Sequence, residues 1–134
     1  MAIKLSVDIR TAIFNNIVDS NCVFMNIYAF GDGEGPPADA DAAVGNGTLI
    51  ATIPISWEIF STSGSASFGG QTTVDLEGTV GYGRILDDYS DVYIQGSAGT
   101  SHALADFVTN TDIYLPADPI SVVGRITQPL EEVP

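Results

Sequence analysis

Residues able to carry out nucleophilic, acid–base or metal chemistry are few in this 134-residue chain, apart from its acids. It has one histidine, His102, and one cysteine, Cys22. A serine or cysteine nucleophile needs a neighbouring base, and a zinc site needs three or four histidine or cysteine ligands. We therefore interpret His102 as a surface-loop residue. Cys22 lies in an apolar run and is interpreted as a buried hydrophobic residue that forms no internal disulfide.

Acidic side chains are the chemistry-bearing type present in number, with 17 in the chain. Asp87, Asp88 and Asp91 share one expected turn, and four more acids lie in residues 31–47: Asp32, Glu34, Asp39 and Asp41. Oxygen-rich loops can bind Ca²⁺, and carboxylate pairs can hydrolyse glycosides. Neither cluster has the spacing of an EF-hand calcium loop, and clusters arise by composition in so acidic a chain. We predict no enzymatic activity, metal or cofactor, with calcium binding or hydrolysis by clustered acids as alternatives.

The charge balance argues against two classes of partner. The net charge is −13, and the four cations are Lys4, Arg10, Arg84 and Arg125. Such a surface repels nucleic-acid phosphates and anionic lipids, so we expect neither nucleic acid nor membrane as a partner. The chain shows no signal-peptide pattern and no apolar window of about 18 residues, which predicts a soluble protein made in the cytoplasm.

Three residues are candidates for contacts rather than for catalysis. Arg84 follows Gly81-Tyr82-Gly83, which lacks the third glycine and the following helix of a dinucleotide fingerprint. We interpret Arg84 either as an exposed strand residue beside an acid, or as a structural ion pair or subunit contact. Trp57 and Phe60 are typical core residues, and they are also candidate subunit anchors.

The elements that must position these residues begin with one predicted helix, over residues 6–20. Ser6 is a suitable N-cap, and Ile9, Ile13 and Ile17 form an apolar stripe along one face. The stripe is wide enough to pack against a sheet.

Strand patterns follow from residue 22 onwards. Residues 48–55 alternate, which places one set on a common face: Leu49, Ala51, Ile53 and Ile55. Ile50 is expected on the opposite face, and Pro54 is expected at an edge or strand end because it lacks an N–H. Residues 81–86 and 92–95 are predicted to form a hairpin. Further strands are expected over residues 22–30, 65–68, 71–76, 112–115 and 120–126.

These elements predict a mainly β fold in one domain, residues 1–128, followed by an acidic extended tail, residues 129–134. We expect a β-sandwich or small barrel of about seven or eight short strands, with the N-terminal helix packed on it. Residues 31–47 hold five glycines and two prolines, and are predicted to form a long surface loop.

The order of motifs resembles a family of small structural proteins of tailed-phage virions. The matching segments are, in order, the helix over residues 6–20, Asn26-Ile27-Tyr28, the loop over residues 31–47, Leu49-Ile50-Ala51-Thr52-Ile53, Gly78-Thr79-Val80-Gly81-Tyr82-Gly83-Arg84, Gly96-Ser97-Ala98-Gly99-Thr100 and Ile120-Ser121-Val122-Val123. The resemblance spans nearly the whole chain and depends on the order and spacing of these segments.

The resemblance implies a virion component, for which we expect a capsid decoration (cement) role. Its expected partners are copies of itself, as a trimer or another homo-oligomer, and the major capsid protein. The candidate subunit-contact residues are Met1, Ala2, Ile3, Lys4, Trp57, Phe60, Arg84, Pro129 and Leu130. A tail, connector or fibre component is the alternative, including a glycan- or receptor-binding module that uses Tyr82, Tyr89 and Tyr93.

Overall fold

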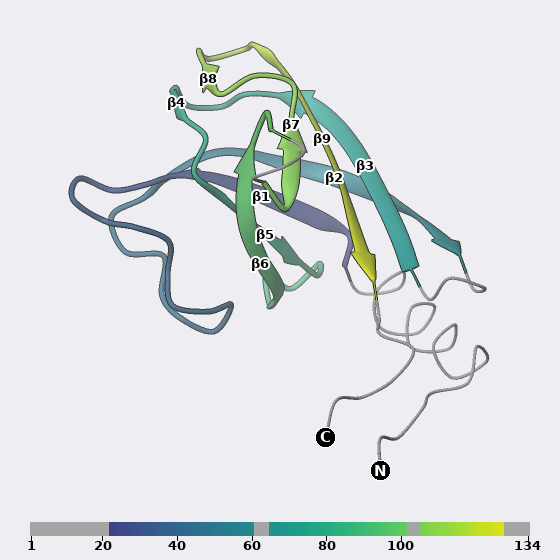
Figure 1. Ribbon diagram of the computed structural model, residues 1–134. Helices are drawn as coiled ribbons and strands as arrows, with labels where there is room; N and C mark the ends of the chain where they lie inside the picture. The colour runs from purple at the N-terminus through teal and green to yellow at the C-terminus, as the bar shows by residue number, and fades with distance from the viewer. Residues whose placement is uncertain (1–21, 61–64, 102–104, 128–134) are drawn as a thin grey trace.

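The computed structural model describes residues 22–60, 65–101 and 105–127 (Figure 1). The predicted helix over residues 6–20, the tail from residue 129 and His102 lie outside the described residues. So do six candidate contact residues: Met1, Ala2, Ile3, Lys4, Pro129 and Leu130. The predictions on all of these stay predictions.

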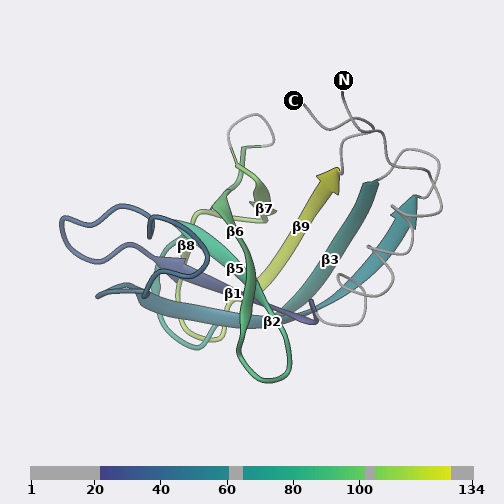
Figure 2. The ribbon, with the colours of Figure 1, turned by 90° about the horizontal axis from the view of Figure 1, so that it is seen from below.

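The described part of the chain is built from strands. They are β1 (Phe24–Ala29), β2 (Thr48–Phe60), β3 (Ser65–Thr73), β4 (Gly78–Thr79), β5 (Tyr82–Leu86), β6 (Val92–Gly99), β7 (Phe107–Thr109), β8 (Ile113–Tyr114) and β9 (Pro119–Thr127). Seven of them close a barrel in the order β1-β2-β3-β9-β7-β6-β5, while β4 and β8 form a separate two-stranded sheet (Figures 1 and 2). The predicted mainly β fold is confirmed, and of the two architectures expected the barrel is the one observed.

Most strand predictions hold, with two changes of extent. The predicted hairpin is the antiparallel pair β5–β6, and the last strand is β9. The two segments expected at residues 65–68 and 71–76 form one continuous strand, β3, which runs through Gly69 and Gly70. A side chain at Gly70 would meet the carbonyl of Pro54, so glycine lets β2 and β3 approach each other here.

Strand β2 is longer than expected because it serves two neighbours in turn. It pairs with β1 up to Pro54 and with β3 from Ile55 onwards. Of the two positions expected for Pro54, a strand end is wrong, whereas the β3 side of the strand is unpaired at Pro54, as at an edge. Proline is tolerated in mid-strand because the pairing with β3 begins only after it, so no ladder bond needs its N–H.

A β-bulge corrects the predicted faces of β2. Ile27 pairs with Ala51 but Tyr28 pairs with Leu49, which leaves Ile50 as the extra residue. Beyond the bulge the alternation is inverted: Ile50 is fully buried, and Leu49 is 36% exposed. The predicted common face therefore holds for Ala51, Ile53 and Ile55 alone.

Side chains fill the barrel interior, as expected for so few strands. The core includes Met25, Ile27, Ile53, Ile85 and Val122. Its aromatic part comprises Trp57, Phe68 and Phe107, with ring centroids 4.8 Å apart for the first two and 5.7 Å apart for the last two. Cys22 is buried, as predicted, and burial raises the pKa of its thiol to about 11.

Candidate functional site

The long connection between β1 and β2, residues 31–47, is named the covering loop here. In both views it lies to one side of the barrel, beside β5 and β6 (Figures 1 and 2). The Gln95 side chain of β6 donates from Nε2 to the Pro37 carbonyl at 2.8 Å, which ties the loop to the wall. The Glu34 carboxylate accepts the backbone N–H of Asn46 and closes the base of the loop.

Arg84 is the main link between this loop and the barrel. Its Nη2 donates to the carbonyls of Ala42 at 2.6 Å and Asp39 at 3.3 Å, and its Nε donates to Gln95 Oε1 at 2.8 Å. The side chain is 4% exposed, so the interpretation of Arg84 as an exposed strand residue is wrong. A guanidinium reaches three acceptors at once because its donors form a rigid fork. Its role as a subunit contact stays a prediction.

Three stacked aromatic rings lie beside Arg84 on the same wall. Tyr82 stacks on Tyr28 with centroids 5.0 Å apart and on Phe30 with centroids 5.8 Å apart. Tyr82 is 1% exposed, and burial raises the pKa of its phenol. Its hydroxyl makes no hydrogen bond to any part of the chain that is described. The predicted glycan platform of Tyr82, Tyr89 and Tyr93 is therefore wrong in one member, because Tyr82 is covered.

The acidic turn between β5 and β6 uses its first carboxylate to hold its own backbone. Asp87 Oδ1 accepts the N–H groups of Tyr89 at 2.8 Å and Asp91 at 3.0 Å. Its Oδ2 accepts the hydroxyl of Tyr93 at 3.2 Å. Within residues 22–60, 65–101 and 105–127, no group of three histidine, cysteine or acidic residues is arranged to hold a metal ion. Asp87 therefore acts as a turn cap.

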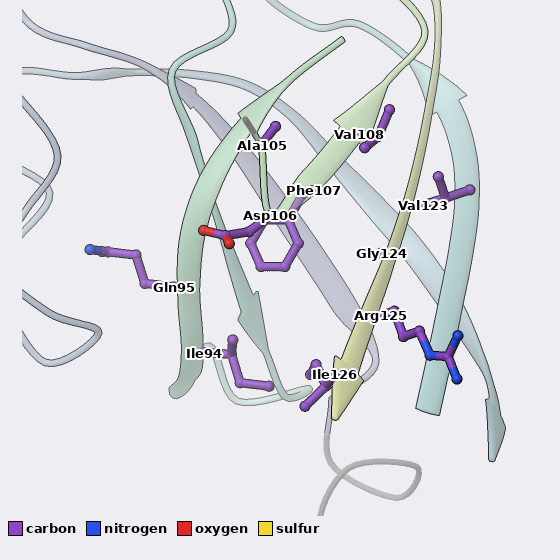
Figure 3. A pocket seen from close by; sticks show the side chains of 10 residues that line it. All are labelled: Ile94, Gln95, Ala105, Asp106, Phe107, Val108, Val123, Gly124, Arg125 and Ile126. Carbon is purple, nitrogen blue, oxygen red and sulfur yellow. The ribbon is translucent and has the colours of Figure 1, made fainter. Parts of the chain in front are cut away.

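A groove of about 680 Å³ opens in the barrel wall between β6 and β9, where β7 is short (Figure 3). The Phe107 ring lies between the two strands, with Ile94 and Ile126 below it. The acid of the groove, Asp106, binds the backbone N–H and the hydroxyl of Ser97 at 2.9 and 3.0 Å. The groove is thus lined by apolar groups, by Gln95 and Arg125, and by the Asp106 carboxylate, which fastens β6 to the segment before β7.

The end of the barrel that carries β4 and β8 exposes large apolar side chains. Ile113 is 68% exposed, Leu115 58% and Leu76 54%. Leu76 lies across from Leu115, between two links that join the same segments. These links are the pairing of Gly78 with Tyr114 and the hydrogen bond from the Ala117 N–H to the Val74 carbonyl. We name Leu76, Ile113 and Leu115 the apolar end. Sequence reasoning missed these residues, although isolated apolar residues next to turn formers were a visible signal.

The remaining candidates are placed as follows. Trp57 packs against Phe68, and its indole N–H donates to the Cys22 carbonyl at 2.7 Å, so this partly buried side chain lies against the core. Its role as a subunit anchor stays a prediction. Phe60 ends β2 opposite Ser65, and its side chain is outside the described part. The structure does not bring Trp57 and Arg84 together, since Trp57 packs on Phe68 of β3 whereas Arg84 bonds the covering loop and Gln95 of β6.

Comparison with protein-family models, with curated proteins and with solved structures found no match to this chain. A further search, over the described residues alone, found no helix with the length and hydrophobicity needed to span a bilayer.

Proposed function

We propose that this protein is a non-enzymatic structural component of a tailed-phage particle, a capsid decoration protein that bridges neighbouring capsid subunits. Its partners are further copies of itself, in a trimer or another homo-oligomer, and the major capsid protein. The order of motifs described above supports the virion assignment. The observation that carries the docking role is the apolar end, three large exposed apolar side chains of which Ile113 lies in β8 and Leu76 and Leu115 lie in the segments next to β4 and β8.

The mechanism is burial of this apolar surface against a neighbouring subunit. Each square ångström of apolar surface removed from water contributes about 25 cal/mol. One such contact is weak, but a decoration protein repeats it at every site on a closed shell, where linked contacts reinforce one another. Small isolated contacts can therefore stabilise a whole particle.

The use of the polar groups supports a structural role. Within the described residues, six carboxylates accept backbone N–H groups: Glu34, Asp39, Asp87, Asp106, Asp112 and Asp118. Each of them fastens a turn or a strand end. A catalytic acid or base must instead face a substrate with a free lone pair or proton.

The proposal is tested by adding the purified protein to particles that lack it. We expect the protein to bind and to raise the temperature at which the particles burst. A variant with three changes, Leu76→Asp, Ile113→Asp and Leu115→Asp, should fold but lose both effects, because charged groups replace the apolar end. The control, Tyr89→Ser, changes an 87% exposed residue in the turn between β5 and β6 and should behave as wild type. Equal robustness of bare and decorated particles would refute the decoration role.

A fibre- or receptor-binding role is the second candidate, favoured by two exposed tyrosines on one hairpin. Tyr89 is 87% exposed and Tyr93 is 41% exposed, and they flank the Asp87 turn. Exposed aromatic rings bind the apolar faces of sugars. Binding of the isolated protein to a glycan array, abolished by Tyr89→Ser and unaffected by the apolar-end variant, would support this role over decoration.

A further inference from the structure

We propose that the covering loop is a releasable strap over a preformed docking face made of Tyr28, Tyr82 and Arg84, and that this face binds a carboxylate-bearing peptide segment of a partner. The inference goes beyond the proposed function, because it assigns a separate binding face. It is tested on the isolated protein, so it can fail independently of the decoration role. It would explain how a buried arginine can still become a contact residue.

The first argument is an asymmetry of burial. None of residues 31–47 is buried, so the covering loop gives no side chain to the core. The residues under it are deeply buried: Tyr28 is 8% exposed, Tyr82 1% and Arg84 4%. Segments with few buried apolar contacts open locally at a much lower free energy than the core. The loop can therefore leave while the barrel stays closed.

The second argument concerns what holds the loop down. Its links to the wall are Gln95 Nε2 to the Pro37 carbonyl and Arg84 Nη2 to the Ala42 and Asp39 carbonyls. All these acceptors are neutral. The hydrogen bonds of Arg84 within the described residues reach an amide and two carbonyls, and none reaches a carboxylate. A carboxylate is a stronger, bidentate acceptor for a guanidinium, so a partner's acid can displace the loop carbonyls.

The third argument is the composition of the hidden face. Tyrosine and arginine are enriched among the residues that dominate the binding energy of protein interfaces. Here they lie two residues apart on β5, with the Tyr82 ring already stacked on Tyr28. The Tyr82 hydroxyl is buried without a hydrogen-bond partner in the described chain. A buried hydroxyl without a partner costs free energy, because it has lost its hydrogen bonds to water. Once the loop is lifted, that hydroxyl gains water or a ligand as a partner.

Hydrogen exchange tests whether the strap opens by itself. The reporters are the N–H of Ala42, bonded to Asp39, and the N–H of Asn46, bonded to Glu34. We expect both to exchange about 100-fold faster than the N–H of Ile55, which bonds the Val23 carbonyl in the barrel. Arg84→Ala and Gln95→Ala should speed the loop reporters further, and the control Arg125→Ala should not. Loop and barrel reporters that exchange together would overturn the proposal.

Dye binding tests the chemistry of the face. Anilinonaphthalene sulfonate joins an aromatic body to an anion, and so mimics an acid on an apolar segment. A double variant, Glu34→Ala with Gln95→Ala, loosens the loop and keeps Arg84; its dye fluorescence should rise about fivefold over wild type. Adding Arg84→Ala should remove most of this gain, whereas adding Arg125→Ala should keep it. Trp57 fluorescence reports that the barrel is intact, since Trp57 packs on Phe68. No gain, or a gain insensitive to Arg84, would overturn the proposal.

Discussion

Large apolar side chains are buried in one region of the molecule, the wall under the covering loop, and exposed in another, the apolar end. Under the loop, Tyr82 is 1% exposed although the loop above it has no buried residue. At the apolar end, Ile113 is 68% exposed and lies on a sheet that pairs only two residues on each strand. The first region is covered by a segment of the same chain, and in the second the apolar side chains are exposed. Burial within a small barrel therefore depends on which segments happen to cross each face.

The largest expected effect comes from removing the covered ring. Tyr82→Ala should lower the free energy of unfolding by about 3 kcal/mol, because it leaves a cavity between Tyr28 and Phe30. Denaturant unfolding followed by Trp57 fluorescence measures this. A loss below about 1 kcal/mol would mean that the ring is not part of the folded core, and the comparison with the apolar end would fail.

Removing only the Tyr82 hydroxyl should have a smaller effect on the free energy of unfolding, of opposite sign to the loss of the whole ring. Tyr82→Phe keeps the stack and removes a buried hydroxyl that has no partner in the described residues. We expect the unfolding free energy to rise by about 1 kcal/mol. Tyr28→Phe is the matched control, since that hydroxyl accepts a hydrogen bond from Asn26 at 3.1 Å and its loss should not stabilise. Destabilisation by Tyr82→Phe would show that the hydroxyl is bonded.

Substitutions at the apolar end should leave the free energy of unfolding almost unchanged. Leu76→Ser or Ile113→Ser should change the free energy of unfolding by less than about 0.5 kcal/mol, because both side chains are already in water. Self-association of the protein, measured by sedimentation, should decrease in the same variants. Strong destabilisation without a change in association would make this end part of the fold.

A last effect, which changes stability only in alkaline solution, concerns Cys22. Burial raises the pKa of this thiol from 9.0 to about 11, so the folded state holds the proton more tightly than the unfolded state. The resulting stability is complete below pH 9 and is lost as the pH rises through 11. The variant Cys22→Ala should lack this pH-dependent component between pH 9 and 11, which denaturation curves over that range will show. An identical pH dependence in both proteins would place the thiol in water.

Most of the strands were predictable, because alternation and turn residues act over a few neighbouring positions. The β5–β6 hairpin, β9 and the loop over residues 31–47 were expected from such signals. The predictions failed where the position of a residue depends on a strand far away in the sequence. Pro54 lies in mid-strand because β3 begins to pair just beyond it, and Leu49 is turned outward because the bulge opposite Tyr28 shifts the register.

The candidate site was less predictable than the fold. Trp57 was expected in the core, and it packs against the core as a partly buried residue of β2. Arg84 was expected to be exposed under one interpretation, because a charged residue is rarely buried without a paired acid. Its acceptors in the loop are backbone carbonyls more than forty positions away in the chain, and no local sequence pattern indicates them.

Local sequence patterns were enough to predict a strand-rich, highly acidic chain, a buried cysteine and the main turns. These properties depend on composition and on side chains a few residues apart. Three features depend on the folded chain: β5 closes the barrel against β1, the covering loop binds Arg84 through its backbone carbonyls, and Leu76, Ile113 and Leu115 are exposed. Each of these depends on the pairing of segments far apart in the chain, which only the folded backbone brings into contact.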